Sequence, residues 1–218
     1  MPNTTVRAVN QLSDEIFELV LRRGEIQFEP GASFAIYHPR RVSRPYSPCS
    51  GQADDDLRFV IHRVPGGKVS GWLADLRPGD EVRLSEPFGC FRPGDLIPGE
   101  EPPVFIATGT GITPFLSALH SVPNLRPAAC LYGVRRLVNA VEVDFLVQRC
   151  PLWLCTSREA CPPHHHGRVT DLLDRLPRRP KTRYFLCGLD RMIEQVSAWL
   201  RSRGVEPGQI HREVFFRA

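Results

Sequence analysis

The sequence predicts an N-terminal antiparallel β-barrel followed by a doubly wound parallel α/β domain. In the first half of the chain, short β-rich segments alternate with glycine and proline turns, which is typical of a small antiparallel barrel. The second half holds continuous apolar runs, which are typical of strands buried on both faces of a parallel sheet. A stretch rich in proline, glycine and glutamate at 98–103 separates the two patterns, so we place the domains at residues 1–99 and 100–218.

Each strand expected in the barrel is bounded by turn residues. β-branched and aromatic side chains are frequent in these segments, and Pro-Gly or Gly-Gly pairs stand beside most of them. The expected strands cover residues 16–21, 34–37, 57–64 and 81–84.

In the second half, the expected strands are the apolar runs at 104–107, 128–132 and 184–187. Helical stretches separate them, and the clearest covers 189–203, where apolar residues recur at helical spacing. This alternation of strands and helices predicts a parallel sheet covered by its crossover helices.

The composition excludes several classes of protein. The chain has 218 residues, 42% hydrophobic and 24% charged, with a formal net charge of +4, which is near a globular average. No apolar run approaches the roughly 18 residues of a membrane span, and the N-terminus does not resemble a signal peptide. The basic residues, nearly all arginine, are scattered among acids rather than clustered. We therefore expect a cytoplasmic monomer that binds neither membrane nor nucleic acid.

The seven cysteines argue against both disulfides and bound metal. Their number is odd, no pair has C-x-x-C spacing, and the cysteines at 150, 155 and 161 do not match plant-type iron–sulfur spacing. The histidine run at 164–166 stands near Cys161 with a spacing that matches no standard zinc site. We expect neither a metal nor an iron–sulfur cluster in this chain.

The strand at 104–107 leads into a glycine-rich turn at 109–114. Glycines let a ligand approach the backbone, and a helix N-terminus favours an anion such as a dinucleotide pyrophosphate. Thr113 is expected to cap the next helix, with Pro114 in its first turn. A dinucleotide fingerprint places an acid about 20 residues later, whereas this chain has Arg135, which suits a phosphorylated ribose. A tight strand-to-helix turn without a ligand is the alternative.

Two segments of the barrel also suit a phosphate-containing cofactor. Residues 44–47 offer a cation, a flat aromatic ring and a hydroxyl, while the glycine turn at 66–70 offers backbone amides that could cradle phosphate. Each segment alone is ordinary barrel composition. Their occurrence together, upstream of the turn at 109–114, favours a bound dinucleotide.

Five motifs stand in an informative order along the chain. They are Arg44-Pro45-Tyr46-Ser47, Gly67-Lys68-Val69-Ser70, Gly109-Thr110-Gly111-Ile112-Thr113-Pro114, Cys187-Gly188 and Glu213-Val214-Phe215-Phe216. In this order and spacing they resemble the ferredoxin–NADP reductase superfamily, with the closest likeness to bacterial ferredoxin (flavodoxin)–NADP reductases. The resemblance extends over residues 6–216, which is nearly the whole chain.

The resemblance implies that the barrel binds FAD. Arg44 would pair with the FAD pyrophosphate, Tyr46 would pack on the isoalloxazine and ribityl chain, and Ser47 would hydrogen-bond the flavin near N5. The residues that it implies around FAD are Arg44, Pro45, Tyr46, Ser47, Val60, Ile61, His62, Arg63, Gly67, Lys68, Val69, Ser70 and Thr110.

The resemblance further implies that the second domain binds NADPH. Ser157, Arg158 and Arg168 would hold the 2′-phosphate, Arg135 the pyrophosphate or adenosine side, and Cys187 would face the nicotinamide. The residues that it implies around NADPH are Gly111, Thr113, Pro114, Arg135, Ser157, Arg158, Arg168, Cys187 and Gly188.

Catalysis is implied to involve Ser47, Cys187 and Glu213. Phe215 and Phe216 would cover the flavin or its adenine as an aromatic lid. Bacterial relatives often end in Tyr-Trp instead, so the chain departs from the family at this point.

The implied function is that of an FAD-dependent enzyme. It would pass hydride from NADPH to FAD and then single electrons to a separate ferredoxin, flavodoxin or oxygenase component, since the protein positions cofactors that carry the chemistry. Two alternatives stand beside this function. One is an NADH-dependent oxygenase reductase or a free-flavin reductase, and the other is a non-catalytic, cofactor-binding electron-transfer subunit.

Overall fold

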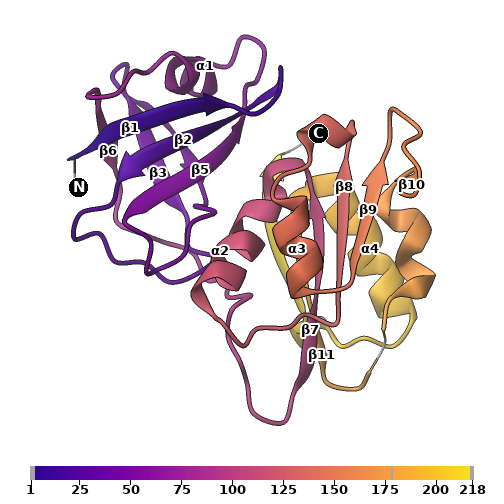
Figure 1. Cartoon of the computed structure of the whole chain (residues 1–218). Helices are drawn as coiled ribbons and strands as arrows, with labels where there is room; N and C mark the ends of the chain where they lie inside the picture. Colours follow the sequence, from indigo (N-terminus) through magenta and orange to yellow (C-terminus); the bar gives the residue numbers. More distant parts are fainter. Residues whose placement is uncertain (1–2, 178, 217–218) are drawn as a thin grey trace. The chain divides into compact units, whose positions relative to one another are not determined.

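The computed structural model describes residues 3–177 and 179–216 of the chain. Its contacts form two compact units, which are shown in Figure 1: residues 1–94 with 113–123, and residues 95–112 with 124–218. Residues 95–99 therefore group with the second unit. Within the second unit, the guanidinium of the buried Arg183 bonds the carbonyl oxygen of Asp95 at 2.5 Å and the carboxylate of Glu100 at 2.5 Å.

The first unit is built on an antiparallel sheet in the strand order β4-β3-β6-β1-β2-β5. Its strands are β1 (Asn3–Gln11), β2 (Ile16–Arg22), β3 (Phe34–His38), β4 (Val42–Tyr46), β5 (Asp56–His62) and β6 (Glu81–Leu84). Two helices complete it, α1 (Lys68–Ala74) and α2 (Thr113–Ser121). The four strands expected from the sequence are confirmed, whereas β1 and β4 were not predicted because polar residues interrupt their pattern.

One apolar core holds the first unit together. Side chains at alternate positions of its strands point into this core, since a strand places every second residue on the same face. Leu19 of β2, Phe34 of β3 and Phe59 of β5 are fully buried, and the two phenylalanine rings meet edge to face at 6.1 Å. Each such side chain stabilises the unit by about 2–3 kcal/mol.

The second unit is built on a parallel sheet in the order β10-β9-β8-β7-β11-β12. Its strands are β7 (Glu101–Thr108), β8 (Ala129–Val134), β9 (Leu152–Thr156), β10 (His165–His166), β11 (Thr182–Leu189) and β12 (Ile210–Phe216). Its helical segments are η1 (Gly109–Ile112), η2 (Leu137–Asn139), α3 (Val143–Arg149), η3 (Val169–Arg175), α4 (Asp190–Ser202) and η4 (Pro207–Gln209). The predicted class, an antiparallel β unit followed by a parallel α/β unit, is confirmed.

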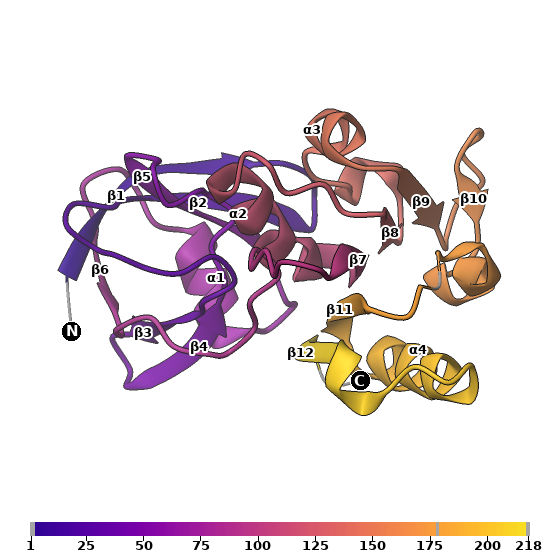
Figure 2. The ribbon, with the colours of Figure 1, turned by 90° about the horizontal axis from the view of Figure 1, so that it is seen from below.

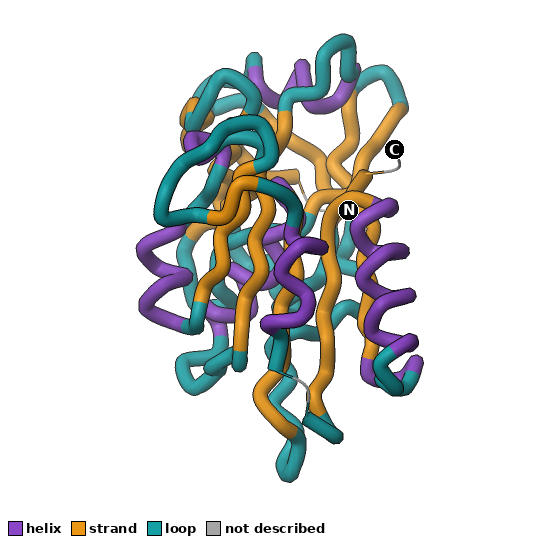
Figure 3. The backbone as a smooth tube through the Cα atoms, turned by 90° about the vertical axis from the view of Figure 1, so that its right-hand side faces the viewer, coloured by secondary structure: helices purple, strands orange, loops and turns teal. Residues whose placement is uncertain are grey.

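Helices lie against both faces of the parallel sheet. Figure 2 shows α3 and α4 on opposite sides of it, and Figure 3 follows the strands as they run alongside α4. On one face, α4 and η3 cover a core that includes Leu186 and Val196. On the other face, the ring of His211 stacks on Phe185 with the ring centroids 4.5 Å apart. No helix within residues 3–177 and 179–216 is long and apolar enough to cross a bilayer.

The strand order creates a topological switch point at β7. The chain that leaves β7 returns first to β8 on one side and later to β11 on the other. In such sheets the carboxyl ends of the strands on either side of the switch are where ligands bind. One local expectation is corrected here: Thr113 is the first residue of α2 rather than its cap, because η1 already turns the chain. The histidine run contributes β10, since His165–His166 pairs with β9.

Candidate functional site

An edge strand of the first unit presents a cation and an aromatic ring on one face. Arg44 and Tyr46 lie two residues apart on β4, in register with buried Ile36 and Phe34 of β3. Arg44 is exposed, while burial raises the pKa of Tyr46 to about 12, an effect that Arg44 partly offsets. The phenol is therefore neutral at physiological pH. Pro45 stands between the two, at a position that only an edge strand readily tolerates.

Ser47 follows this strand and is held in place by a second hydroxyl. It is 2% exposed, and its Oγ lies 2.8 Å from the Oγ of Ser33. The segment beyond it is anchored to β5, because the amide of Cys49 donates to the carbonyl oxygen of Arg58 at 2.7 Å and the Arg58 amide donates to Ser50 Oγ at 3.1 Å. The direction in which the chain leaves Tyr46 is thus fixed by backbone bonds.

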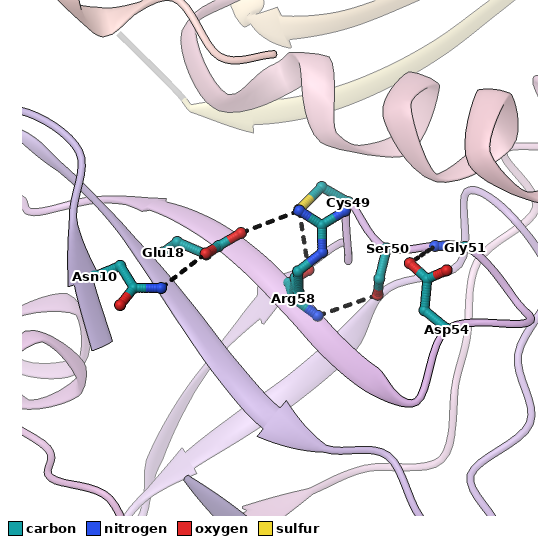
Figure 4. Close-up of polar contacts among 7 residues, drawn as sticks. All are labelled: Asn10, Glu18, Cys49, Ser50, Gly51, Asp54 and Arg58. Carbon is teal, nitrogen blue, oxygen red and sulfur yellow. Dashed lines mark hydrogen bonds and ion pairs between the residues drawn. The ribbon is translucent and has the colours of Figure 1, made fainter. Parts of the chain in front are cut away.

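A polar cluster around the side chain of Arg58 supports the same segment (Figure 4). Its guanidinium contacts the carboxylate of Glu18 at 3.2 Å, and Glu18 also accepts a hydrogen bond from Asn10 at 3.1 Å. Further along, the Gly51 amide donates to the carboxylate of Asp54 at 2.9 Å. The loop after β4 is thus bonded to Arg58 of β5, which is itself held by Glu18 of β2, so the position of Ser47 does not depend on the loop alone.

The Gly-Gly segment leads directly into α1, which packs against β2, β3 and β4. Gly67 is required by space, because an added Cβ would lie 2.9 Å from the Val64 carbonyl oxygen and 2.8 Å from Ser70 Oγ. Ser70 in turn accepts a hydrogen bond from the Val64 amide at 3.1 Å. No side chain among the described residues caps the helix at Gly67, so the amides that open α1 at Lys68 and Val69 have no side-chain acceptor there.

Residues 60–63 are largely committed to contacts within the first unit. Val60 and Ile61 are buried, and Ile61 belongs to the core. His62 lies 4.0 Å from a glutamate, and Arg63 forms a 3.1 Å ion pair with Asp75. Their proposed place beside the adenosine end of FAD stays a prediction.

At the switch point of the second unit, the turn after β7 packs tightly on the turn after β11. The Leu189 amide donates to Thr108 Oγ1 at 2.9 Å. A Cβ added at Gly111 would lie 2.5 Å from the carbonyl oxygen of Cys187, and one added at Gly188 would collide with Thr108. Glycine is needed at both places because an added Cβ would come within 3 Å of these atoms. The structure thereby brings together two motifs that are about 75 residues apart in sequence.

Cys187 and Glu213 are direct partners across the pairing of β11 and β12. Burial raises the pKa of the Cys187 thiol, and the negative charge of Glu213 raises it further, so the sulfur is a neutral thiol. Thr110 is also buried in η1, and Phe215 is partly buried in β12. The side chain of Phe216 lies outside the described residues.

Three arginines gather at the carboxyl ends of β8, β9 and β10. The Arg158 amide donates to the Arg135 carbonyl oxygen at 2.9 Å, and the Ser157 amide donates to the Val134 carbonyl oxygen at 3.0 Å. These bonds hold the segments after β8 and β9 side by side. Arg168 follows β10, whose last residue pairs with the last residue of β9. The predicted residues Arg135, Ser157, Arg158 and Arg168 are therefore brought to one edge of the sheet.

Two carboxylates that the sequence prediction did not include orient this edge. Glu159 accepts a hydrogen bond from the Leu137 amide at 2.5 Å, which ties the segment after β9 to η2. Asp171 accepts one from the Arg168 amide at 2.8 Å and contacts His165 at 3.2 Å. The bond from Arg168 is the main reason that the pKa of Asp171 is lowered. An acid directly after the Ser-Arg pair was the signal that could have identified Glu159.

The remaining cysteine and histidine residues do not form a metal centre among the residues that the structure describes. Within those ranges, no group of three or more histidine, cysteine, aspartate or glutamate side chains is placed to hold a metal ion. The groups that could bind ligands are described for each unit by itself: a cation, a ring and amides without a side-chain acceptor in the first unit, and a thiol, a carboxylate and three arginines in the second.

Comparison with known proteins identifies the family of the chain. Residues 5–92 match the family of oxidoreductase FAD-binding domains. The chain is 30% identical over 226 residues to the ferredoxin–NAD(P)(+) reductase component of the naphthalene 1,2-dioxygenase/salicylate 5-hydroxylase systems of Ralstonia sp., covering 97% of this chain and 68% of that one. It is 28% identical over 233 residues to ferredoxin–NADP reductase of Pseudomonas aeruginosa, covering 92% and 89%.

A solved structure resembles both units. The cytochrome P450 reductase GcoB of Amycolatopsis superposes with a TM-score of 0.87 and 27% identity, covering 100% of this chain and 70% of that one. The chain spans about two thirds of the length of the oxygenase-system relatives that it matches. The sequence match to the FAD-binding domain, the relatives that cover both units and the shared fold all agree, and the chain therefore belongs to the ferredoxin–NADP reductase superfamily of FAD-dependent oxidoreductases.

Proposed function

We propose that the protein passes hydride from NADPH to FAD held by the first unit and then delivers single electrons to a separate carrier protein. The observation that carries this proposal is the grouping of three arginines at the end of the parallel sheet where a phosphorylated ribose would lie. Bound FAD would supply the ability to accept two electrons together and release them singly. The protein's own residues would bind FAD and NADPH, orient them and exclude water from them.

In the first unit, Arg44 and Tyr46 suit a dinucleotide because they lie on one face of β4. A guanidinium pairs well with a pyrophosphate through charge-assisted hydrogen bonds, and the neutral Tyr46 ring offers a flat surface for the flavin and ribityl chain. The uncapped amides of α1 at Lys68 and Val69 would bind the same pyrophosphate from the other side. Ser47, fixed by Ser33, would hydrogen-bond the flavin near N5.

In the second unit, the switch point would hold the nicotinamide end. The turns at Gly111 and Gly188 pack closely on Cys187 and Thr108, which supports a fixed position for Cys187 beside the nicotinamide. Cys187 would present a neutral thiol to that ring, and its partner Glu213 would hold or relay a proton. Thr110 would approach the flavin, and Phe215 would cover the flavin or its adenine.

The 2′-phosphate is the feature that would distinguish NADPH from NADH. Arg158 and Arg168, helped by the Ser157 hydroxyl, would supply charge-assisted bonds to it, with Arg135 beside the pyrophosphate or adenosine. Binding a ribose diol normally requires a free acidic side chain. The acid nearest to these arginines in sequence, Glu159, already accepts from the Leu137 amide, which supports NADPH as the substrate.

Electron acceptance by a separate partner has support from the chain and from its relatives. The cysteine spacing within these 218 residues matches no iron–sulfur motif, which supports a carrier outside this stretch of sequence. The Ralstonia relative is described as a reductase component, and the Amycolatopsis structure as a cytochrome P450 reductase. A ferredoxin, a flavodoxin or an oxygenase component would serve as that carrier. The net charge of +4 would favour an acidic one.

The decisive experiment is anaerobic mixing of the FAD-loaded protein with NADPH or NADH while flavin absorbance is followed. NADPH should reduce the flavin faster than NADH does. In the double variant Arg158→Gln/Arg168→Gln, the ratio of the two reduction rates should fall roughly 10- to 100-fold, because the rate with NADPH falls while the rate with NADH is little changed. Failure of both coenzymes to bleach the flavin would leave only an electron-transfer role. Equal rates would favour an NADH-dependent reductase, and loss of FAD on gel filtration would favour a free-flavin reductase.

A further inference from the structure

One histidine of the run at 164–166 contacts a carboxylate at the coenzyme edge of the second unit. His165 lies in β10, which pairs with the end of β9. Its Nε2 is 3.2 Å from the carboxylate oxygen Oδ2 of Asp171, and about one third of the histidine side chain and half of the aspartate side chain are exposed. The proposed phosphate contacts use neither side chain, so the pair calls for an explanation of its own.

The same oxygen of Asp171 receives a second hydrogen bond. The Arg168 amide donates to Oδ2 at 2.8 Å. This bond and the contact with His165 both lower the pKa of Asp171, so its carboxylate is ionised and can only accept hydrogen bonds. Nε2 of His165 is therefore the donor in the 3.2 Å contact. One carboxylate oxygen thus joins an imidazole to a backbone amide.

The turn between these donors is compact and is anchored at both ends. An added Cβ at Gly167 would lie 2.6 Å from His165 Nε2 and closer still to Asp171 Oδ2, so the pair closes directly over this glycine. The Gly167 amide donates to the carbonyl oxygen of Thr156, the last residue of β9, at 3.0 Å. At the other end, Val169 is buried in the core of the second unit. The backbone that carries the arginine at 168 therefore has a fixed position at the sheet edge.

The charge of Asp171 is a potential competitor for Arg168. The carboxylate lies 2.8 Å from the amide of that residue, so a rotation of the two side chains would let it pair with the guanidinium. Within residues 3–177 and 179–216, however, the exposed guanidinium of Arg168 forms no ion pair with a carboxylate. Because two donors hold Oδ2, the carboxylate does not turn freely. His165 supplies the one of these two donors that belongs to a side chain.

We propose that His165 is a specificity-determining positioning residue: it holds the Asp171 carboxylate away from the Arg168 guanidinium, which then binds the 2′-phosphate of NADPH. Without the imidazole, the carboxylate would turn toward the guanidinium. It would then neutralise a charge that the phosphate needs and would repel the phosphate itself. His165 acts through Asp171 and does not touch the coenzyme. The inference rests on the proposed function, because it takes the ligand of Arg168 to be the 2′-phosphate.

The test measures binding of NADP+ and NAD+ to the FAD-loaded protein by isothermal titration calorimetry. His165→Ala should raise the Kd for NADP+ about five- to tenfold, whereas the Kd for NAD+ should stay within about twofold of the parent value. KM for NADPH should rise by a similar factor with kcat unchanged. His166→Ala is the matched control, because the next residue of a strand points to the opposite face, and it should bind both coenzymes as the parent does.

A double variant separates this role from a merely structural one. Asp171→Asn keeps an acceptor oxygen for the Arg168 amide but carries no charge. Added to His165→Ala, it should therefore restore the affinity for NADP+ to within about twofold of the parent value, which general damage to the turn would not allow. His165→Gln keeps an N–H donor and should also bind NADP+ as the parent does. Thermal unfolding of the variants should match that of the parent, since the changed side chains are exposed and leave no cavity.

The outcomes distinguish this inference from the proposed function. An unchanged Kd for NADP+ in His165→Ala, or no recovery in the double variant, would overturn the role of His165 while leaving the preference for NADPH in place. Equal affinities of the parent chain for NADP+ and NAD+ would contradict the preference itself, and the role of His165 would fall with it.

Discussion

The two units of the molecule build their candidate binding groups in different ways. In the antiparallel unit, Arg44 and Tyr46 lie on one face of β4, and the pairing of β4 with β3 holds them there. The helix α1, which contacts β4, comes from a later part of the sequence. In the parallel unit, the groups stand at the carboxyl ends of strands, where every βα connection must begin. In a parallel sheet the order of the strands is enough to bring functional residues together. In an antiparallel sheet the register between paired strands must do so.

This difference makes the turns at the switch point of the second unit sensitive to backbone crowding, and it makes β4 of the first unit sensitive to changes in single side chains. The turns after β7 and β11 meet backbone to backbone at Gly111 and Cys187. On β4, by contrast, the proposed contacts with cofactor belong to one cation and one ring. The variants below test that contrast.

The largest effect is expected from Gly111→Ala. Its Cβ would lie 2.5 Å from the Cys187 carbonyl oxygen, so one of the two backbones must shift. The free energy of unfolding should fall by about 2–4 kcal/mol. Reduction by NADPH should slow by roughly 100-fold if the turn moves by about 1 Å, while FAD retention is unchanged. Stopped-flow absorbance and chemical denaturation measure the two effects.

Gly208→Ala is the matched control for crowding, because an added Cβ there meets no atom within 4 Å. It should alter neither the free energy of unfolding nor the rate of reduction. If Gly111→Ala behaves like this control, the two turns do not form the nicotinamide site.

In the first unit, Arg44→Ala should weaken FAD binding. Loss of a charge-assisted contact with a pyrophosphate is worth about 1.5–3 kcal/mol, or roughly 10- to 150-fold in Kd. Arg44→Lys should recover part of it, since an ammonium keeps the charge but not the fork. Flavin fluorescence titration measures Kd, and Arg40→Ala on the adjacent exposed turn is the control. Equal losses in Arg44→Ala and Arg40→Ala would contradict the assigned role.

A smaller effect is expected from Glu159→Ala at the coenzyme edge. The variant leaves the Leu137 amide without its carboxylate acceptor, at a cost of about 1 kcal/mol, and KM for NADPH should rise about fivefold with kcat unchanged. Glu159→Gln keeps an acceptor oxygen and should behave almost as the parent. A fall in kcat with constant KM would argue that Glu159 acts on the reaction rather than on the position of the arginines.

The smallest effect concerns pH and the second unit alone. Burial and the nearby Arg183 lower the pKa of His211, against the opposing charges of Glu100 and Asp95. The folded state therefore favours the neutral ring, and this contribution to stability is complete above the unfolded pKa of about 6.5. It is lost as pH falls from there through the lower folded pKa, with a slope below about 1.4 kcal/mol per pH unit.

Urea unfolding at several pH values measures this slope, and His211→Gln should reduce it. Because the ring is only partly buried, solvent screening keeps the change well below that limit. A stability that rises on acidification in the parent but not in the variant would show that the sign is wrong.

The sequence carries the fold of the second unit more clearly than that of the first. Unbroken apolar runs identify β7, β8 and β11, and strand order alone then brings Gly111 beside Cys187. Nothing local marks β4, where polar residues and Pro45 stand on a strand held by its neighbour. The helix α1 was expected only as a glycine turn, since seven residues give a weak periodic signal. Glu159 was missed because its role depends on a backbone amide 22 positions away.

The composition of β4 has a consequence beyond ligand binding. An outermost strand can recruit the strand of another molecule and begin aggregation, and a proline next to a charged side chain makes it a poor template for such growth. Arg44 and Pro45 would therefore protect the newly made polypeptide before any flavin reaches it. The same two residues would first oppose self-association and would later contact FAD in the proposed site.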